Sequence, residues 1–278
     1  MRLTLGFSPC PNDTFIFDAM VHGRIDTEGL EFEYRLAGVD ELNRLAIKSE
    51  PDIVKISYHA YAYAAHNYLI LDSGSALGYR SGPLLIGKRH LSHDEISKAS
   101  VAIPGEYTTA NLLFSIAWPE ARNKKVYLFS DIERALLDEE IDAGLIIHET
   151  RFTYARKGLV SLADMGDYWG RLTGLPVPLG AIVIRRSIDG EIAQKVNRVL
   201  RRSIGYAYSD SLASYQFVSS NAREMDSDVM NSHIRLYVNE FTMSLGEEGR
   251  AAVSKLFAVA TERGVIPPMP EVIFLPDR

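Results

Sequence analysis

A set of polar side chains stands where predicted strands end and helices begin, the positions from which an α/β fold presents groups to a small ligand. The set comprises an amide, a carboxylate, an ammonium group, hydroxyls and an imidazole: Asn12, Asp13, Lys55, Ser57, Thr108, Thr109 and His148. Hydroxyls at a helix N-terminus favour an anionic group, and an imidazole can act as a general base at neutral pH. The set is typical of a site that binds a small acidic molecule and takes a proton from it.

His148 is the candidate general base. It follows the uncharged run Ala143-Gly144-Leu145-Ile146-Ile147, which predicts a buried strand that ends at the imidazole. A partly shielded imidazole is neutral at physiological pH and can accept a proton from bound substrate. Glu149 either orients this ring or faces water. A hydrogen-bonded histidine with no chemical role is the alternative interpretation.

The candidate binding residues come from two predicted element ends. Thr108 and Thr109 precede a helical stretch, where hydroxyls and unpaired N–H groups favour a carboxylate. A cap that only stabilises the helix is the alternative. Lys55 and Ser57 end a short β-branched run, and Lys55 would place a positive charge at the acidic end of the ligand. A lysine exposed to solvent is the alternative there.

The stretch Gly6-Phe7-Ser8-Pro9-Cys10-Pro11-Asn12-Asp13-Thr14-Phe15 follows a short apolar strand pattern. Prolines on both sides of Cys10 must end that strand in a turn. Asn12, Asp13 and Thr14 are N-cap candidates for the helix that follows, so a rigid loop should present polar groups at the end of the first strand. Cys10 is either a nucleophile activated by the helix N-terminus or a small residue packed under the turn.

The elements that would position these residues alternate between strand and helix. Strand patterns at 3–5, 30–36 and 53–57 are each followed by a helical stretch, and 82–88 is a further strand. A second series contains strands at 100–105, 125–129 and 142–147. The extended segment 175–184 then leads back, and the chain after Asp189 is helical. Such alternation predicts parallel βαβ units.

The two series predict an α/β, two-lobed periplasmic-binding-protein-like (type II) fold, with a ligand cleft between lobes that close by hinging. The chain should cross near residues 90 and 177. Residues 1–90 and 178–278 would then form a larger lobe, and 91–177 a smaller one. A single doubly wound sheet is the alternative.

Composition limits the classes of partner. The 278 residues carry a net charge of −6, and scattered lysines and arginines offer no basic face to nucleic acid. No apolar run approaches the ~20 residues of a membrane span, and no signal peptide is apparent, so we expect a cytoplasmic protein without membrane insertion. The histidines lack zinc-site spacing, and no glycine-rich nucleotide motif is present. We therefore expect no metal and no cofactor, while a homodimer is left open.

Four motifs together resemble the 1,4-dihydroxy-6-naphthoate synthase family of the futalosine pathway to menaquinone. They are Ser8-Pro-Cys-Pro-Asn-Asp-Thr-Phe15, Lys55-Ile56-Ser57, Gly105-Glu-Tyr-Thr-Thr-Ala110 and Gly144-Leu-Ile-Ile-His-Glu149. The resemblance implies cleavage of cyclic dehypoxanthine futalosine to dihydroxynaphthoate and a sugar-derived fragment, without metal or redox cofactor. It implies that His148 is the proton acceptor. It also implies substrate contacts from both lobes: Lys55, Ile56, Ser57, Thr108, Thr109 and Ala110.

Two other functions remain open at this point. Chorismate dehydratase of the same pathway has a similar fold, although the Ser8–Phe15 motif and the His148-Glu149 pair argue against it. A non-catalytic binding protein for small molecules would also share the fold. Such a protein should carry an export signal or lipobox, and we find neither in this sequence.

Overall fold

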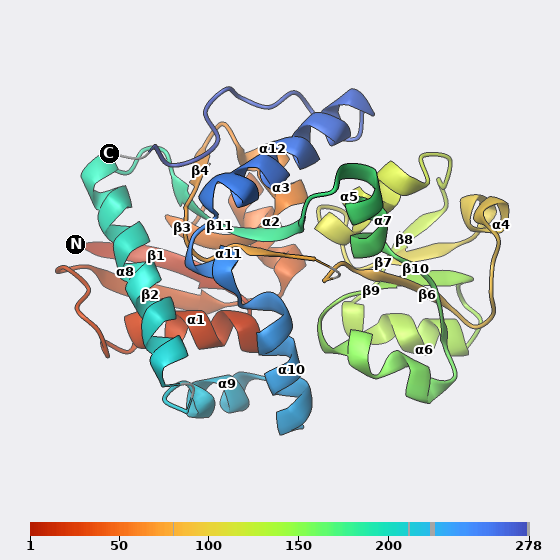
Figure 1. Cartoon of the computed structure of the whole chain (residues 1–278), viewed down its shortest axis with the longest axis horizontal. Coiled ribbons are helices and arrows are strands. Elements are labelled where there is room, and N and C mark those ends of the chain that lie inside the picture. Colours follow the sequence, from red (N-terminus) through yellow and green to blue (C-terminus); the bar gives the residue numbers. More distant parts are fainter. Residues whose placement is uncertain (80, 211, 223–225, 277–278) are drawn as a thin grey trace.

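The computed structural model describes residues 1–79, 81–210, 212–222 and 226–276, and the side chains of His148 and Glu149 lie outside this description. The chain forms two α/β lobes, each built on one sheet (Figure 1). The sheet of the larger lobe has the order β2-β1-β3-β11-β4, with β5 also paired to β11. Its strands are β1 (Arg2–Phe7), β2 (Glu31–Leu36), β3 (Ile53–Ser57), β4 (Tyr68–Ile70), β5 (Ala76–Gly78) and β11 (Val177–Arg185).

The three N-terminal strands of this sheet are parallel, whereas β11 runs antiparallel to β3, β4 and β5. Helices α1 (Pro11–Val21) and α8 (Gly190–Ser209) pack together on one face with α9 (Tyr215–Asn221) and α10 (Ser227–Tyr237). Residues 11–20 of α1 are all buried, because neighbouring helices and the sheet surround it. Polar groups at its first turn are therefore held away from bulk water.

The other face of this sheet shares a hydrophobic core with the smaller lobe. The helices that supply most of it are α2 (Val39–Ile47), α3 (Tyr58–Ala64), α5 (Thr109–Ala117), α7 (Met165–Thr173) and α12 (Gly246–Glu262). Helix α3 of the larger lobe packs directly against α5 of the smaller lobe. The remaining helices are α4 (His93–Lys98), α6 (Ile132–Leu137) and α11 (Glu240–Met243). No helix in the described ranges is long and apolar enough to cross a membrane.

The sheet of the smaller lobe has the order β10-β6-β9-β7-β8. Its strands are β6 (Leu84–Gly87), β7 (Val101–Ile103), β8 (Lys124–Val126), β9 (Ala143–Ile146) and β10 (Val160–Asp164). The predicted crossing near residue 90 placed β6 in the larger lobe, which is wrong, because β6 pairs antiparallel with β9 and β10. A short, fully buried apolar run pairs equally well in either sheet, so its sequence carries no sign of its partner. The first crossing therefore precedes β6, while β11 does return to the first sheet as expected.

Candidate functional site

A cavity with an empty volume of about 740 Å³, counted out to its opening, lies between the lobes. Every residue predicted to bind substrate lines it: Asn12, Asp13, Lys55, Ile56, Ser57, Thr108, Thr109 and Ala110. The wall also includes residues that sequence reasoning missed: Ser8, Val39, Leu42, Ala76, Ser81, Pro83, Ile147, Leu179, Gly180, His233 and Tyr237. The structure thus brings the predicted residues to one space, and their contacts with substrate stay predictions.

The first turn of α1 supplies the acidic group of the site. Cys10 is the N-cap residue and Pro11 the first helical residue, so Asn12 and Asp13 lie inside the first turn and do not cap it as expected. Pro11 suits this position because it lacks an N–H group and its φ angle is already helical. Asp13 is 3% exposed, and its Oδ2 accepts a 2.7 Å hydrogen bond from Ser8 Oγ. The Ser8–Asp13 contact therefore holds the loop against the helix.

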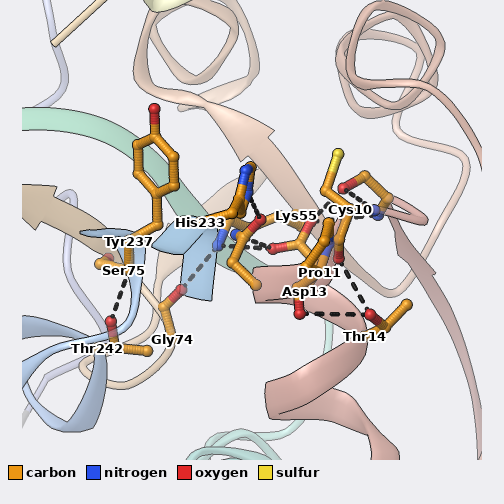
Figure 2. A network of polar contacts seen from close by, with 12 residues as sticks. Cys10, Pro11, Asp13, Thr14, Lys55, Gly74, Ser75, His233, Tyr237 and Thr242 are labelled. Carbon is orange, nitrogen blue, oxygen red and sulfur yellow. Dashed lines mark hydrogen bonds and ion pairs between the residues drawn. The ribbon is translucent and has the colours of Figure 1, made fainter. Parts of the chain in front are cut away.

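Lys55 and Asp13 form a buried ion pair, drawn in Figure 2, with 3.2 Å between Lys55 Nζ and Asp13 Oδ1. Lys55 is 8% exposed and also donates a 3.0 Å hydrogen bond to the carbonyl of Gly74. The alternative interpretation of Lys55 as a lysine exposed to solvent is therefore wrong. Asp13 balances the lysine charge, so the expected net positive charge at the acidic end of a ligand is absent from this pair.

Asn12 joins this network to a histidine on α10. Its Nδ2 donates to Asp13 Oδ1 at 2.9 Å, and its Oδ1 lies 2.9 Å from His233 Nε2. An ionised carboxylate only accepts hydrogen bonds, so the Asp13 contact fixes the orientation of the amide. The Asn12 oxygen then faces His233, and His233 Nε2 must carry a proton and donate it. The fully buried His233 thereby orients Asn12 at the wall of the cavity.

The spacing of His233 and Tyr237 indicates that they share one helix face, although it does not show what that face contacts. Met230, His233, Ile234 and Tyr237 recur at i, i+3, i+4 and i+7, which places them on one face of a helix. A histidine on an otherwise apolar helix face needs a polar partner, which in this protein is Asn12. The sequence gives no sign that the partner lies more than 200 residues away along the chain.

Asn43 and His59 of the larger lobe hold the cavity wall through hydrogen bonds, some of which cross to the smaller lobe. Asn43 Oδ1 accepts from the N–H of Ser57 at 2.9 Å, and Asn43 Nδ2 donates to the carbonyl of Tyr107 at 3.3 Å. His59 Nδ1 lies 3.1 Å from the carbonyl of Thr108 and must donate to it. Burial lowers the pKa of His59 to about 4, so this imidazole is neutral at physiological pH.

Thr108 caps α5, which the sequence analysis gave as the alternative to a role in binding. Its Oγ1 accepts a 3.3 Å hydrogen bond from the N–H of Asn111 and donates to the carbonyl of Gly105 at 2.8 Å. Thr109 Oγ1 instead reaches the other lobe and donates to the carbonyl of Leu179 at 2.6 Å. That carbonyl is available because the pairing of β11 with β5 shifts register between Pro178 and Gly180, as at a β-bulge. The bulge thus ties the start of α5 to the returning strand.

His148 begins the 3₁₀ segment His148–Phe152, directly after β9 and Ile147. Ile147 lines the cavity, and α10 packs against the segment that His148 begins. The side chain of His148 lies outside the described residues, so its role as general base stays a prediction. Among the described residues, no group of three or more His, Cys, Asp or Glu side chains is arranged to hold a metal ion.

Comparisons with known proteins place the chain in a family. It is 41% identical over 273 residues to 1,4-dihydroxy-6-naphthoate synthase of Thermus thermophilus, covering 98% of this chain and 99% of that protein. It is 40% identical over 281 residues to the synthase of the same name from Streptomyces coelicolor, covering 99% and 98%. Residues 3–262 also match the family model described as menaquinone biosynthesis. The chain belongs to the 1,4-dihydroxy-6-naphthoate synthase family. The resemblance seen in the four motifs is thereby confirmed.

Solved structures agree with the predicted fold. A protein of Archaeoglobus fulgidus is 36% identical, with a TM-score of 0.90 over 95% of this chain and 98% of that chain. The alkanesulfonate-binding protein of Xanthomonas axonopodis pv. citri is 12% identical, with a TM-score of 0.72 over 98% and 96% of the two chains. A Candida albicans protein described as having the generic periplasmic binding protein fold gives a TM-score of 0.70 at 14% identity, over 98% and 93%. These distant likenesses confirm the fold alone.

Proposed function

We propose that the cavity between the lobes is the active site in which this enzyme converts cyclic dehypoxanthine futalosine to 1,4-dihydroxy-6-naphthoate. The enzyme belongs to menaquinone biosynthesis through its family. The observation that carries the proposal is the convergence on one cavity of residues from the motifs at 8–15, 55–57 and 105–110. The fourth motif adds Ile147, the residue before His148, to the same wall.

The cavity offers two kinds of group to a substrate that carries a carboxylate. The first N–H groups of a helix have no partner inside the helix, and the first residues of α5, Thr109 and Ala110, line the cavity. These N–H groups and the Ser57 hydroxyl would bind the carboxylate through hydrogen bonds. Apolar residues such as Leu42, Ile56 and Leu179 would contact the ring system.

His148 would start the reaction by accepting a proton from a substrate hydroxyl. The electron pair of the broken O–H bond then forms a carbonyl, and the adjacent carbon–carbon bond breaks. The electron pair of that bond passes into the ring, which becomes aromatic, so aromatic stabilisation drives the cleavage. A general base is most effective when its pKa lies near the operating pH, and the ordinary pKa of a histidine side chain meets this condition.

Replacing His148 tests this assignment. His148→Asn should lower turnover by about 10²-fold or more while substrate binding is largely kept. Formation of the naphthoate chromophore reports turnover, and calorimetric titration with the naphthoate product reports binding. His90→Asn, at an exposed position in the same lobe, is the matched control. Near-normal turnover of His148→Asn would rule out the proposed base.

The same assay separates this function from the alternatives. We expect the naphthoate chromophore with cyclic dehypoxanthine futalosine and no dehydration of chorismate. Conversion of chorismate in place of the futalosine would overturn the proposal, and binding without conversion of either compound would support a non-catalytic binding protein. The cytoplasmic location and the division into lobes, with β6 moved to the smaller one, stay predictions, and a homodimer stays open.

A further inference from the structure

Ser81 lies between β5 and β6, where the chain passes from the larger lobe to the smaller one. It is 1% exposed and lines the cavity. Its Oγ has no hydrogen-bond partner among the residues that the structure describes. Buried hydroxyls nearly always have a partner, because a buried polar group without one is energetically costly. A hydroxyl of this kind in a cavity wall indicates that a ligand supplies the partner.

The hydroxyl lies on the cavity side of β5. A Cβ atom added to Gly78 would lie 2.8 Å from Ser81 Oγ, so the hydroxyl fills the space that a side chain at position 78 would occupy. Side chains two residues apart on a strand point to the same face, and Ala76, two residues before Gly78, lines the cavity. Gly78 therefore makes room for the Ser81 hydroxyl on the wall that Ala76 also forms.

The backbone around Ser81 is held by close packing. A Cβ atom added to Gly82 would lie 2.1 Å from the backbone nitrogen of Gly166, so the two chain segments touch without side chains between them. Pro83, whose φ angle is fixed by its ring, follows and also lines the cavity. The hydroxyl is thus presented from a fixed backbone, which lowers the entropy cost of a contact with a ligand.

We propose that Ser81 Oγ hydrogen-bonds a carboxylate or hydroxyl oxygen of the substrate and is a further binding residue of the synthase reaction. The inference rests on the proposed function of the cavity, because it assigns the partner of Ser81 to the same ligand. It adds a contact from the crossing between the lobes to those from β3 and α5. Substrate binding would supply the partner that none of the described residues gives this hydroxyl.

Ser81→Ala tests the proposal through two effects of opposite sign. Removing an unsatisfied buried hydroxyl should raise the melting temperature of the free enzyme. Losing a hydrogen bond to substrate should lower kcat/KM by about tenfold, with weaker calorimetric binding of the naphthoate product. A residue with a purely structural role would not give a more stable enzyme that binds its ligand less tightly.

Ser75→Ala is the matched control. Ser75 is also a fully buried serine, but its Oγ lies 2.9 Å from the hydroxyl of Tyr58, and it is not part of the cavity wall. The control should lower the melting temperature and leave kcat/KM nearly unchanged. Gly78→Ala should displace the Ser81 hydroxyl and lower kcat/KM as Ser81→Ala does.

Two results would overturn the inference. One is an unchanged kcat/KM in Ser81→Ala, which would mean that substrate does not use the hydroxyl. The other is a lower melting temperature of the free Ser81→Ala enzyme, which would mean that the hydroxyl already has a partner in the protein. Failure of the proposed function is recognised separately, because the unsubstituted enzyme would then form no naphthoate.

Discussion

Asp13→Asn removes one charge of the buried pair and keeps the shape of the side chain. Each oxygen of Asp13 is met by donors: Oδ1 by Asn12 Nδ2 and Lys55 Nζ, and Oδ2 by the hydroxyl and N–H of Ser8. An asparagine must turn its NH₂ group toward one of these two pairs of donors, whichever way its amide is oriented. It also leaves the ammonium group of Lys55 buried without a counter-charge.

The expected cost follows from burial. Asp13 is 3% exposed and Lys55 8%, so water screens neither group to a useful extent. Removing one partner of a buried ion pair typically costs about 3–5 kcal/mol. For a chain of this size, that loss lowers the melting temperature by about 10 °C. Lys55→Met should cost less, because the Asp13 carboxylate would keep its hydrogen bonds from Ser8 and Asn12.

Calorimetry and urea unfolding of both single variants and the double variant measure the pair directly. We expect the double variant to be more stable than the sum of the single losses predicts, with a coupling of about 1 kcal/mol or more. The exposed pair Arg2–Glu33, 3.1 Å apart, is the control, and Glu33→Gln should change the free energy of unfolding by less than about 1 kcal/mol. The reasoning would be refuted if the losses of stability in the two single variants added up to that of the double variant. It would also be refuted if Asp13→Asn had the same melting temperature as the unsubstituted enzyme.

Two further predictions concern the wall of the cavity. Burial lowers the pKa of His59 to about 4 from its ordinary 6.5, so between these pH values only the unfolded chain binds the proton and stability falls as pH falls. Urea unfolding should show that His59 lowers the free energy of unfolding by about 2 kcal/mol between pH 7 and pH 5. If the free energy of unfolding of His59→Asn fell with pH as steeply as that of the unsubstituted enzyme, the prediction would be wrong. Gly180→Ala places a Cβ atom 3.0 Å from the carbonyl of Ile56 and should raise KM, whereas Gly170→Ala, which meets no atom within 4 Å, should not. Equal KM values in steady-state assays of both variants would contradict this.

The alternation of strands and helices could be predicted because β1, β3, β7 and β9 are short apolar runs, β2 alternates apolar and polar residues, and helical patterns follow them. Strand β10 and helix α7 could not be predicted, because the sequence pattern of residues 158–174, which contain both, is typical of a loop. α7 contains Gly166 and Gly170, which disfavour a helix. The structure explains Gly166, because an added Cβ atom there would lie 2.7 Å from the backbone nitrogen of Gly82. The glycine serves a contact between distant segments, which no local pattern reveals.

The site, too, contains residues that the sequence predicts and residues that it does not. Asn12, Asp13, Lys55, Ser57 and the threonines stand at ends of elements, and the topology of parallel strands brings such ends together. Ser81 and His233 do not stand at such element ends. Ser81 lies in a connection between strands of different sheets, and His233 lies within a helix whose packing on α1 follows from the tertiary fold. Their places in the wall depend on which segments pack together, which spacing along the chain does not specify.

The balance of charge at the site changes the expected way in which an acidic ligand is held. The sequence suggested attraction by a free lysine, but Asp13 neutralises Lys55 at 3.2 Å. Among the described residues of the wall, the groups that we expect to bind a carboxylate are then neutral donors: the first N–H groups of α5, the hydroxyl of Ser57 and, by our inference, that of Ser81. Neutral donors hold an anion without placing a strong positive charge beside the base. An imidazole at the same site could then carry the proton that it removes, because Asp13 balances the charge of Lys55, the cation that the described part of the wall contains.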